Sequence, residues 1–204
     1  MTARPRLVVL ISGSGTNLQA LLTASSVGRL PADIVAVISN RPDAFGLERA
    51  RQAGLPALLL EKLPSQTRRD YDVALADAVG AHQPDWVILA GWMRLLTMAF
   101  LERFPGRVVN LHPALPGAFP GVDAIARAFT AFQLGVITET GVMVHLVPDE
   151  GVDAGPVLAQ TTVPIYSGDT LADLEARVHA AEHDLLVTTL ARLVIEGQGA
   201  APHE

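Results

Sequence analysis

The sequence predicts an α/β protein with a doubly wound, mostly parallel sheet in a single domain. Two observations predict this fold class. Short apolar runs alternate along the chain with segments of helical period, and the runs are apolar at nearly every residue rather than at every second one. Strands buried on both faces have this composition, and the order strand, helix, strand implies right-handed crossovers between parallel neighbours.

The expected strands are apolar segments at Leu7–Ile11, Ile34–Ile38, Pro56–Leu60, Trp86–Leu89, Val108–Asn110, Gly141–Val147 and Val157–Ile165. The expected helices are Asn17–Ala24, Leu47–Ala53, Arg68–Val79 and Leu171–Glu196. Gly54 and Gly80 directly follow the second and third of these helices, at the position where glycine commonly ends a helix.

The segment after the fifth expected strand has a different composition. Prolines at positions 113, 116 and 120, with glycines close by, predict a long irregular loop. Residues 148–155 are a second turn-rich segment, between the last two expected strands. Long loops in compact domains are usually functional or disordered, so both segments are candidates for function. No repeat or linker divides the chain, and we interpret residues 1–204 as one domain.

Composition excludes several classes of protein. The 204 residues include no cysteine, which excludes disulfides, thiolate zinc sites and cysteine nucleophiles. The apolar run at Leu7–Ile11 is too short for a signal sequence or a membrane span. The net charge is -6 and the basic residues are scattered, so no nucleic-acid footprint is visible. We expect a soluble, cytoplasmic protein that binds neither nucleic acid nor membrane.

A glycine-rich motif, SGSGTN at residues 12–17, lies between the first expected strand and the first expected helix. Its glycines let the backbone approach a ligand, and the free N–H groups at a helix N-terminus favour an anion, usually phosphate. A nucleoside-triphosphate loop would need a lysine before Thr16, and none is present. A monophosphate site therefore fits best, and a tight turn without a ligand is the alternative.

A dinucleotide site is a further alternative for the same motif. It would need a third glycine where Leu18 stands, and an acid after the second strand, where the sequence is Ser39-Asn40-Arg41. These differences disfavour NAD, although Arg41 could meet the extra phosphate of NADP. An NADP-binding or phosphate-binding module without catalysis remains an alternative interpretation.

Asn110 and His112 lie where the fifth expected strand ends, and ligands of open α/β sheets collect at the carboxyl ends of the strands. The two residues are two apart, so both side chains project the same way from an extended segment. An asparagine amide can donate to a developing oxyanion, and a histidine can donate or shuttle a proton near neutral pH. A capping asparagine and a hydrogen-bonded core histidine are the alternative.

Asp153 lies in an acidic turn, DEGVDAGP at residues 149–156. Acids beside glycine and proline are ordinary turn chemistry, which is the alternative to a catalytic role. A carboxylate that reaches His112 would raise the pKa of the imidazole and hold the imidazolium form, which a donor to an oxyanion needs. We interpret four other histidines as structural: His82, His145, His179 and His203. Glu182-His183 is only a fragment of zinc spacing, and no metal site is expected.

Six stretches taken together carry a family resemblance: LVVLISGSGTNLQALL, ISNRPDAFGLERARQAG, VILAGWMRLL, VVNLHPALPGAFPG, TGVMVHLVPDEGVDAGPVLAQ and ARVHAAEHDLL. Over nearly its whole length the chain resembles the phosphoribosylglycinamide formyltransferases of purine biosynthesis. The resemblance implies a Rossmann-like formyltransferase fold over residues 1–204. It implies a phosphate and ribonucleotide site in the N-terminal half, and a folate site and catalytic loop in the C-terminal half.

The resemblance also implies individual roles. The residues that would hold the ribonucleotide are Gly13, Ser14, Gly15, Thr16, Asn17 and Glu182. The residues that would line the site for 10-formyltetrahydrofolate, the co-substrate, are Arg68, Met93, Arg94, Leu95, Leu96 and Asn110. The catalytic residues would be Asn110, His112 and Asp153. The implied partners are these small molecules, with no metal; the oligomeric state stays open, a homodimer included.

The chain departs from the family pattern at three places, one of which is the acidic loop before Asp153, one residue longer than in some relatives. Pro116-Gly117 stands where the family often has Leu-Pro, and Asp123 stands where it often has histidine. The role of Asp123 and the mobility of the loop Pro113–Gly121 therefore stay open. The resemblance also reaches methionyl-tRNA formyltransferases and formyltetrahydrofolate hydrolases. A tRNA enzyme is expected to have a basic C-terminal extension and a hydrolase an extra N-terminal domain, and the sequence favours neither.

Overall fold

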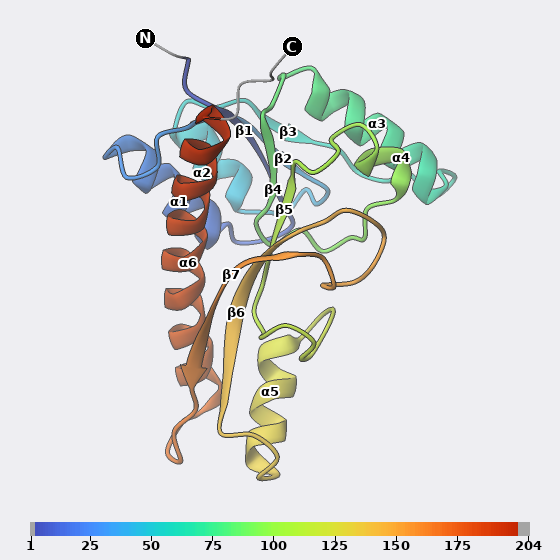
Figure 1. Ribbon diagram of the computed structural model, residues 1–204. Helices are drawn as coiled ribbons and strands as arrows, with labels where there is room; N and C mark the ends of the chain where they lie inside the picture. The colour runs from blue at the N-terminus through green and yellow to red at the C-terminus, as the bar shows by residue number, and fades with distance from the viewer. Residues whose placement is uncertain (1–2, 200–204) are drawn as a thin grey trace.

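The computed structural model describes residues 3–199, and its strands form one seven-stranded sheet (Figure 1). The strands are β1 (Arg6–Ile11), β2 (Asp33–Ser39), β3 (Ala57–Leu59), β4 (Trp86–Leu89), β5 (Val108–His112), β6 (Glu139–Leu146) and β7 (Val157–Pro164). Their order is β3-β2-β1-β4-β5-β6-β7. The pairs from β3 to β5 are parallel, and β6 and β7 pair antiparallel. The predicted doubly wound, mostly parallel sheet is confirmed.

Helices cover both faces of this sheet. They are α1 (Thr16–Ser26), α2 (Gly46–Gln52), α3 (Arg68–Gly80), α4 (Met98–Leu101), α5 (Ala124–Gln133) and α6 (Leu171–Gly199). In β1, Leu7 and Val9 belong to the core with α1 and α6, whereas Val8 and Leu10 belong to the core with α3 and α4. Alternate side chains of one strand thus fill two cores, which explains why the run is apolar throughout. Figure 1 shows the two helical layers on either side of the sheet.

Helices α4 and α5 were not predicted, and Gly80 does not lie past the end of its helix as predicted. The segment Ala124–Gln133 places apolar side chains at a helical spacing, but no helix or strand was predicted there. Gly80 lies inside the last turn of α3 instead of following it, and Gln83 takes the left-handed conformation there, with φ of 47°. Gly54 does follow α2 with φ of 72°, as expected. His203 lies outside the described residues.

The chain direction across the sheet reverses between β1 and β4. From β1 the chain moves outward to β2 and β3, and it then returns to β4 on the other side of β1. The segments that follow these two strands meet: the Ser12 N–H donates to Gly91 O at 3.0 Å, and the Met93 N–H donates to Ser12 Oγ at 2.9 Å. Open α/β sheets bind ligands at such a switch point, so the fold directs attention here. Within residues 3–199, no helix is long and apolar enough to span a membrane.

Candidate active site

A cavity of about 540 Å³ lies at the carboxyl ends of β4 and β5. Its walls come from the segment after β4, the end of β5, the start of α5 and the loop between β6 and β7. The volume lies in the range of small-molecule sites. Asn110, His112 and Asp153 all line it, so the structure brings the three expected catalytic residues to one place.

Asp153 joins the other two residues. His112 Nδ1 lies 3.2 Å from Asp153 Oδ2, and Asn110 Nδ2 donates to Asp153 Oδ1 at 3.0 Å. Asn110 and His112 share a face of β5, while Leu111 between them belongs to the core with α1 and α6. Asp153 has a φ of 50°, which is unfavourable for a residue with a Cβ. Non-glycine residues in this conformation cluster at functional sites, where surrounding contacts hold them.

His145 is a fourth member of this group, and its interpretation as only a structural residue needs correction. The strand register pairs it with Asn110 across β5 and β6. Its Nδ1 lies 2.8 Å from Leu146 O, and its Nε2 lies 3.1 Å from Asn110 Nδ2. In the tautomer with the proton on Nδ1, which can donate to Leu146 O, Nε2 accepts from the Asn110 amide. Nε2 also lies 3.6 Å from Asp153 Oδ1. His145 thus helps to orient the Asn110 amide. A polar residue inside an apolar strand was the available signal.

The electrostatics of His112 differ from the expectation. Burial lowers the pKa of the His112 ring, and the Asp153 carboxylate and the Phe119 carbonyl oppose this shift without reversing it. The predicted effect of Asp153 is present, because its carboxylate raises the pKa of His112, but burial has the larger effect and lowers the net pKa below its ordinary value. Burial alone would raise the pKa of Asp153, but its contacts with His145, the Gly121 N–H and His112 lower it, so the carboxylate is ionised.

The proline-rich loop closes over these residues. His112 Nε2 lies 3.1 Å from Phe119 O, and the Gly121 N–H donates to Asp153 Oδ2 at 2.8 Å. Arg127 of α5 donates to Pro120 O at 2.7 Å, so the helix that the sequence analysis missed anchors the loop. Both ring nitrogens of His112 thus face oxygen acceptors, an arrangement that only the protonated ring satisfies at both positions.

Asp123 lies after the proline-rich loop and directly before α5. Its φ is 56°, it occupies the N-cap position of α5 without a side-chain cap hydrogen bond, and it lines the large cavity. The carboxylate is therefore placed where it can face a ligand.

The residues expected to contact folate are divided between the wall and the rim of the cavity. Met93, Arg94, Leu95, Leu96 and Asn110 all line it. Met93 and Leu95 are 64% and 48% exposed, which is unusual for large apolar side chains and fits a surface that a flat ligand covers. Arg68 does not line the cavity. Its guanidinium lies 4.0 Å from Glu150, which does line it, so Arg68 belongs to the rim.

The glycine-rich turn forms the N-terminus of α1. Gly15 is the N-cap residue, with φ of 72°. Among the described residues, the N–H groups of Ser14 and Gly15 have no hydrogen-bond acceptor. The Asn17 side chain is buried, and its Oδ1 has no partner within residues 3–199. Buried polar atoms are normally paired, so this oxygen and these N–H groups are suited to a ligand.

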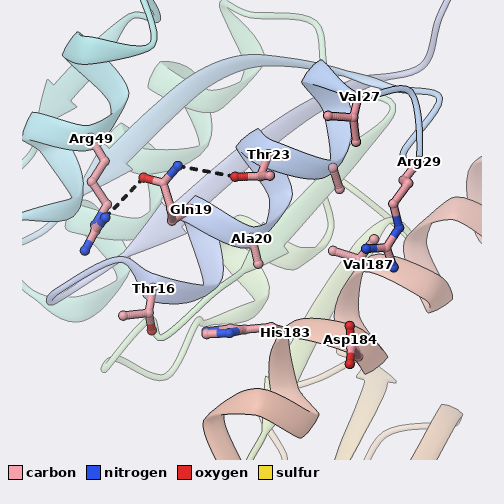
Figure 2. Close-up of a pocket in the computed structure, with 11 residues that line it drawn as sticks. Thr16, Gln19, Ala20, Thr23, Val27, Arg29, Arg49, His183, Asp184 and Val187 are labelled. Atoms are coloured by element: carbon pink, nitrogen blue, oxygen red, sulfur yellow. Dashed lines mark hydrogen bonds between the residues drawn. The ribbon is translucent and has the colours of Figure 1, made fainter.

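Glu182 lies on α6 and is only 5% exposed. Its carboxylate lies 2.5 Å from His179 Nδ1, and this hydrogen bond raises the pKa of His179. Glu182 lines neither of the two cavities described here. Its neighbour His183 lines the smaller one, of about 390 Å³, together with Thr16 of the glycine-rich turn. Figure 2 shows this smaller cavity between α1 and α6.

Two observations bear on the alternative ligands. Arg41, the residue that could have met the extra phosphate of NADP, forms an ion pair with Asp43 at 2.9 Å. Asn40 accepts a hydrogen bond from Ser12 Oγ at 2.6 Å and supports the turn instead of a ribose. The one residue that favoured NADP, Arg41, is thus already paired with an acid. Within residues 3–199, no three histidine or acidic side chains are grouped in a way that could hold a metal ion.

Comparison with known proteins agrees with this geometry. Residues 5–190 match the formyl transferase family. A phosphoribosylglycinamide formyltransferase of Schizosaccharomyces pombe is 45% identical and covers 94% of this chain and 98% of its own length. One from Escherichia coli is 42% identical, covering 87% and 81%. The crystal structure of glycinamide ribonucleotide transformylase 1 from Symbiobacterium toebii has a TM-score of 0.89 at 42% identity, covering 96% and 90%. The chain therefore belongs to the formyl transferase family.

Proposed function

We propose that this enzyme transfers the formyl group of 10-formyltetrahydrofolate to the amine of 5-phosphoribosylglycinamide, in de novo purine biosynthesis. The products are phosphoribosyl-N-formylglycinamide and tetrahydrofolate. The observation that carries the proposal is the cluster of Asn110, His112 and Asp153 in one cavity at the switch point of the sheet, near a turn with free N–H groups. The names of the relatives support it.

Asn110 and His112 would stabilise the formyl oxygen, which becomes negative when the neutral glycine amine attacks the formyl carbon. Burial lowers the pKa of the resting His112 ring and so favours its neutral form, although both ring nitrogens face oxygen acceptors. Negative charge on a nearby oxygen favours the protonated ring, so His112 would take up a proton from solvent as that charge develops and release it when the formyl oxygen loses the charge. Both amide protons of Asn110 face acceptors, Asp153 and His145, so the formyl oxygen must compete with these contacts.

Asp153 would stabilise the protonated ring of His112, from which it lies 3.2 Å away. Its own lowered pKa keeps the carboxylate ionised at neutral pH. The attacking amine becomes an ammonium group and must lose a proton, while the departing folate nitrogen must gain one. Asp153 would help to pass this proton, through water, between the two nitrogens. These roles need neither a covalent enzyme intermediate nor a metal ion.

The two substrates would occupy the two sites described above. The ribonucleotide phosphate would bind to the backbone of residues 13–17, where the N–H groups of Ser14 and Gly15 have no acceptor within the described part of the chain. Glu182 would contact the same substrate from α6. The folate would lie in the large cavity, with Met93 and Leu95 against its ring and Arg68 at the rim. We place the reaction in the cytoplasm, where a chain without cysteine is at no disadvantage.

A spectrophotometric turnover assay tests the proposal. The purified enzyme, the variant His112→Ala and the control His82→Ala would each receive 10-formyltetrahydrofolate with and without phosphoribosylglycinamide. We expect turnover that requires the amine, falls about a hundredfold or more in His112→Ala, and is unchanged in His82→Ala. Loss of folate without the amine would instead indicate a hydrolase. No turnover, with thermal stabilisation by NADP and none by folate, would indicate a binding module.

A further inference from the structure

The glycine-rich turn accepts two hydrogen bonds from α2. Gly46, the first residue of α2, donates its N–H to Gly13 O at 3.1 Å. Arg49, one turn further along the same helix, donates from Nε to Ser14 O at 2.9 Å. Two successive carbonyl groups of the turn thus both accept hydrogen bonds from α2.

This arrangement decides where the N–H groups of the turn point. A trans peptide unit is planar, and its C=O and N–H bonds point in opposite directions. When α2 binds the carbonyls of Gly13 and Ser14, the N–H groups of Ser14 and Gly15 in the same peptide units are directed away from α2. These are the N–H groups that have no acceptor among the described residues. The contacts with α2 therefore leave these groups available for an anion.

Arg49 is itself fixed in place. Its Nη1 donates to Gln19 Oε1 on α1 at 3.1 Å, and its guanidinium lies over the ring of Phe45, 5.0 Å from the ring centroid. Figure 2 shows the hydrogen bond between Arg49 and Gln19 of α1 as a dashed line. The planar guanidinium thus bridges the turn and the helix that the turn begins. A lysine could not reproduce two donors in this fixed geometry.

We propose that Arg49 is a positioning residue for phosphate recognition: it orients the Ser14–Gly15 peptide unit so that its N–H group faces the substrate phosphate. The inference rests on the proposed function, since it concerns how the ribonucleotide phosphate is bound. Arg49 acts through the turn, and its contacts with Ser14 O and Gln19 Oε1 carry the role. The positive charge of the guanidinium is secondary to its geometry.

The test compares phosphoribosylglycinamide with the same amine lacking its 5′-phosphate. The variants are Arg49→Met, Arg49→Lys and the control Arg51→Met. The control removes a charge from the same helix, and within residues 3–199 the guanidinium of Arg51 forms one ion pair, with Glu48 at 3.7 Å. In Arg49→Met, we expect KM for the phosphorylated substrate to rise about tenfold, the effect of losing one oriented hydrogen bond, with KM for the folate little changed. The ratio of kcat/KM between the two substrates should fall by the same factor.

Each outcome is informative because the ratio is measured within one variant, so partial unfolding lowers both values and cancels. Arg49→Lys should lose as much of the ratio as Arg49→Met, and Arg51→Met should keep it. An unchanged kcat/KM ratio in Arg49→Met would overturn the inference. A ratio that Arg49→Lys restores to the wild-type value would also overturn it, because the positive charge and not the orientation of the turn would then explain phosphate binding. A wild-type enzyme that does not distinguish the two substrates would overturn the phosphate site of the proposed function, and this inference with it.

Discussion

The two ends of the site are built from different parts of the chain. At the glycine-rich turn, the groups suited to a ligand are backbone N–H groups, oriented by hydrogen bonds from α2. At the end of β5, they are side chains, held together by contacts among Asn110, His112, His145 and Asp153. The geometry of the turn depends on glycines that lack a Cβ atom, whereas the geometry at the end of β5 depends on the functional groups of particular side chains. The two ends should therefore respond to different kinds of substitution.

Removing the charge of Asp153 should give the largest effect at the side-chain end. Asp153→Asn keeps the shape but cannot stabilise a protonated His112, so we expect kcat to fall about a hundredfold or more. The measurement is steady-state turnover with both substrates saturating. The control Asp77→Asn removes a carboxylate whose one ion pair among the described residues is an exposed contact with Arg103 at 3.0 Å, and kcat should not change. A kcat within twofold of wild type in Asp153→Asn would contradict the proposed catalytic group.

Adding one methyl group should break the backbone end. A Cβ on Gly15 would lie 2.6 Å from the Cα of Gly46, and the φ of 72° is strained for alanine. Gly15→Ala should therefore displace the turn and raise KM for the ribonucleotide about tenfold, with a smaller change in kcat. The measurement is KM for each substrate in turn.

Gly28→Ala is the matched control for that substitution. Gly28 has φ of 75°, but a Cβ there meets nothing within 4 Å. It should cost about 1 kcal/mol of stability, from the left-handed conformation alone, and leave KM unchanged. Equal changes of KM in the two variants would mean that the turn itself is not the binding site.

His145 allows a finer test of the side-chain end. His145→Phe removes the acceptor for Asn110 Nδ2, so the amide loses one of its two anchors and kcat should fall about tenfold. His145→Gln offers an amide oxygen in its place and should recover part of the loss. KM for the ribonucleotide should stay constant in both variants. If glutamine recovers nothing while both variants fold like wild type, His145 acts through something other than this hydrogen bond.

The smallest effect is expected for His179, whose partner Glu182 is the only side chain expected to reach the ribonucleotide from α6. The hydrogen bond with Glu182 raises the pKa of His179, so its stabilisation is fully present below the unfolded pKa of about 6.5 and is lost as pH rises through the folded value. His179→Gln should thus lose less than about 1 kcal/mol at low pH and nothing at high pH, since the ring is half exposed.

Urea denaturation at several pH values measures this difference, and His183 supplies a control of opposite sign. Burial lowers the pKa of His183, so His183 makes the free energy of unfolding of the wild-type protein decrease as pH falls through its unfolded pKa. His183→Gln should remove that decrease. Parallel pH profiles for the two variants would contradict the assignment of the His179–Glu182 pair.

Much of this architecture was predictable from the sequence. The seven strands and four of the helices lie at the expected positions, because a buried parallel strand or an amphipathic helix is encoded in a window of neighbouring residues. The spacing of Asn110 and His112 predicted that their side chains share a face, and they do. The glycine-rich motif predicted a turn directly before a helix, and Gly15 is the N-cap residue of α1.

Other features depended on residues far apart in the chain. The contact between Asn110 and His145 follows from the register of β5 and β6, and the anchoring of the turn by Arg49 follows from the packing of α2 against it. The net lowering of the pKa of His112 was not predicted, because the presence of an acid is visible in a sequence, whereas the depth of burial is not.

The sequence by itself thus determined the element order, the sheet type, the turn and the identity of the reactive groups, since each depends on local spacing or on side-chain chemistry. Only the tertiary structure decided which groups touch, which backbone N–H groups stay free and which charges are desolvated. The physical reason is that these properties depend on distances between segments, and those distances are set by how the two helical layers and the loops close over the sheet.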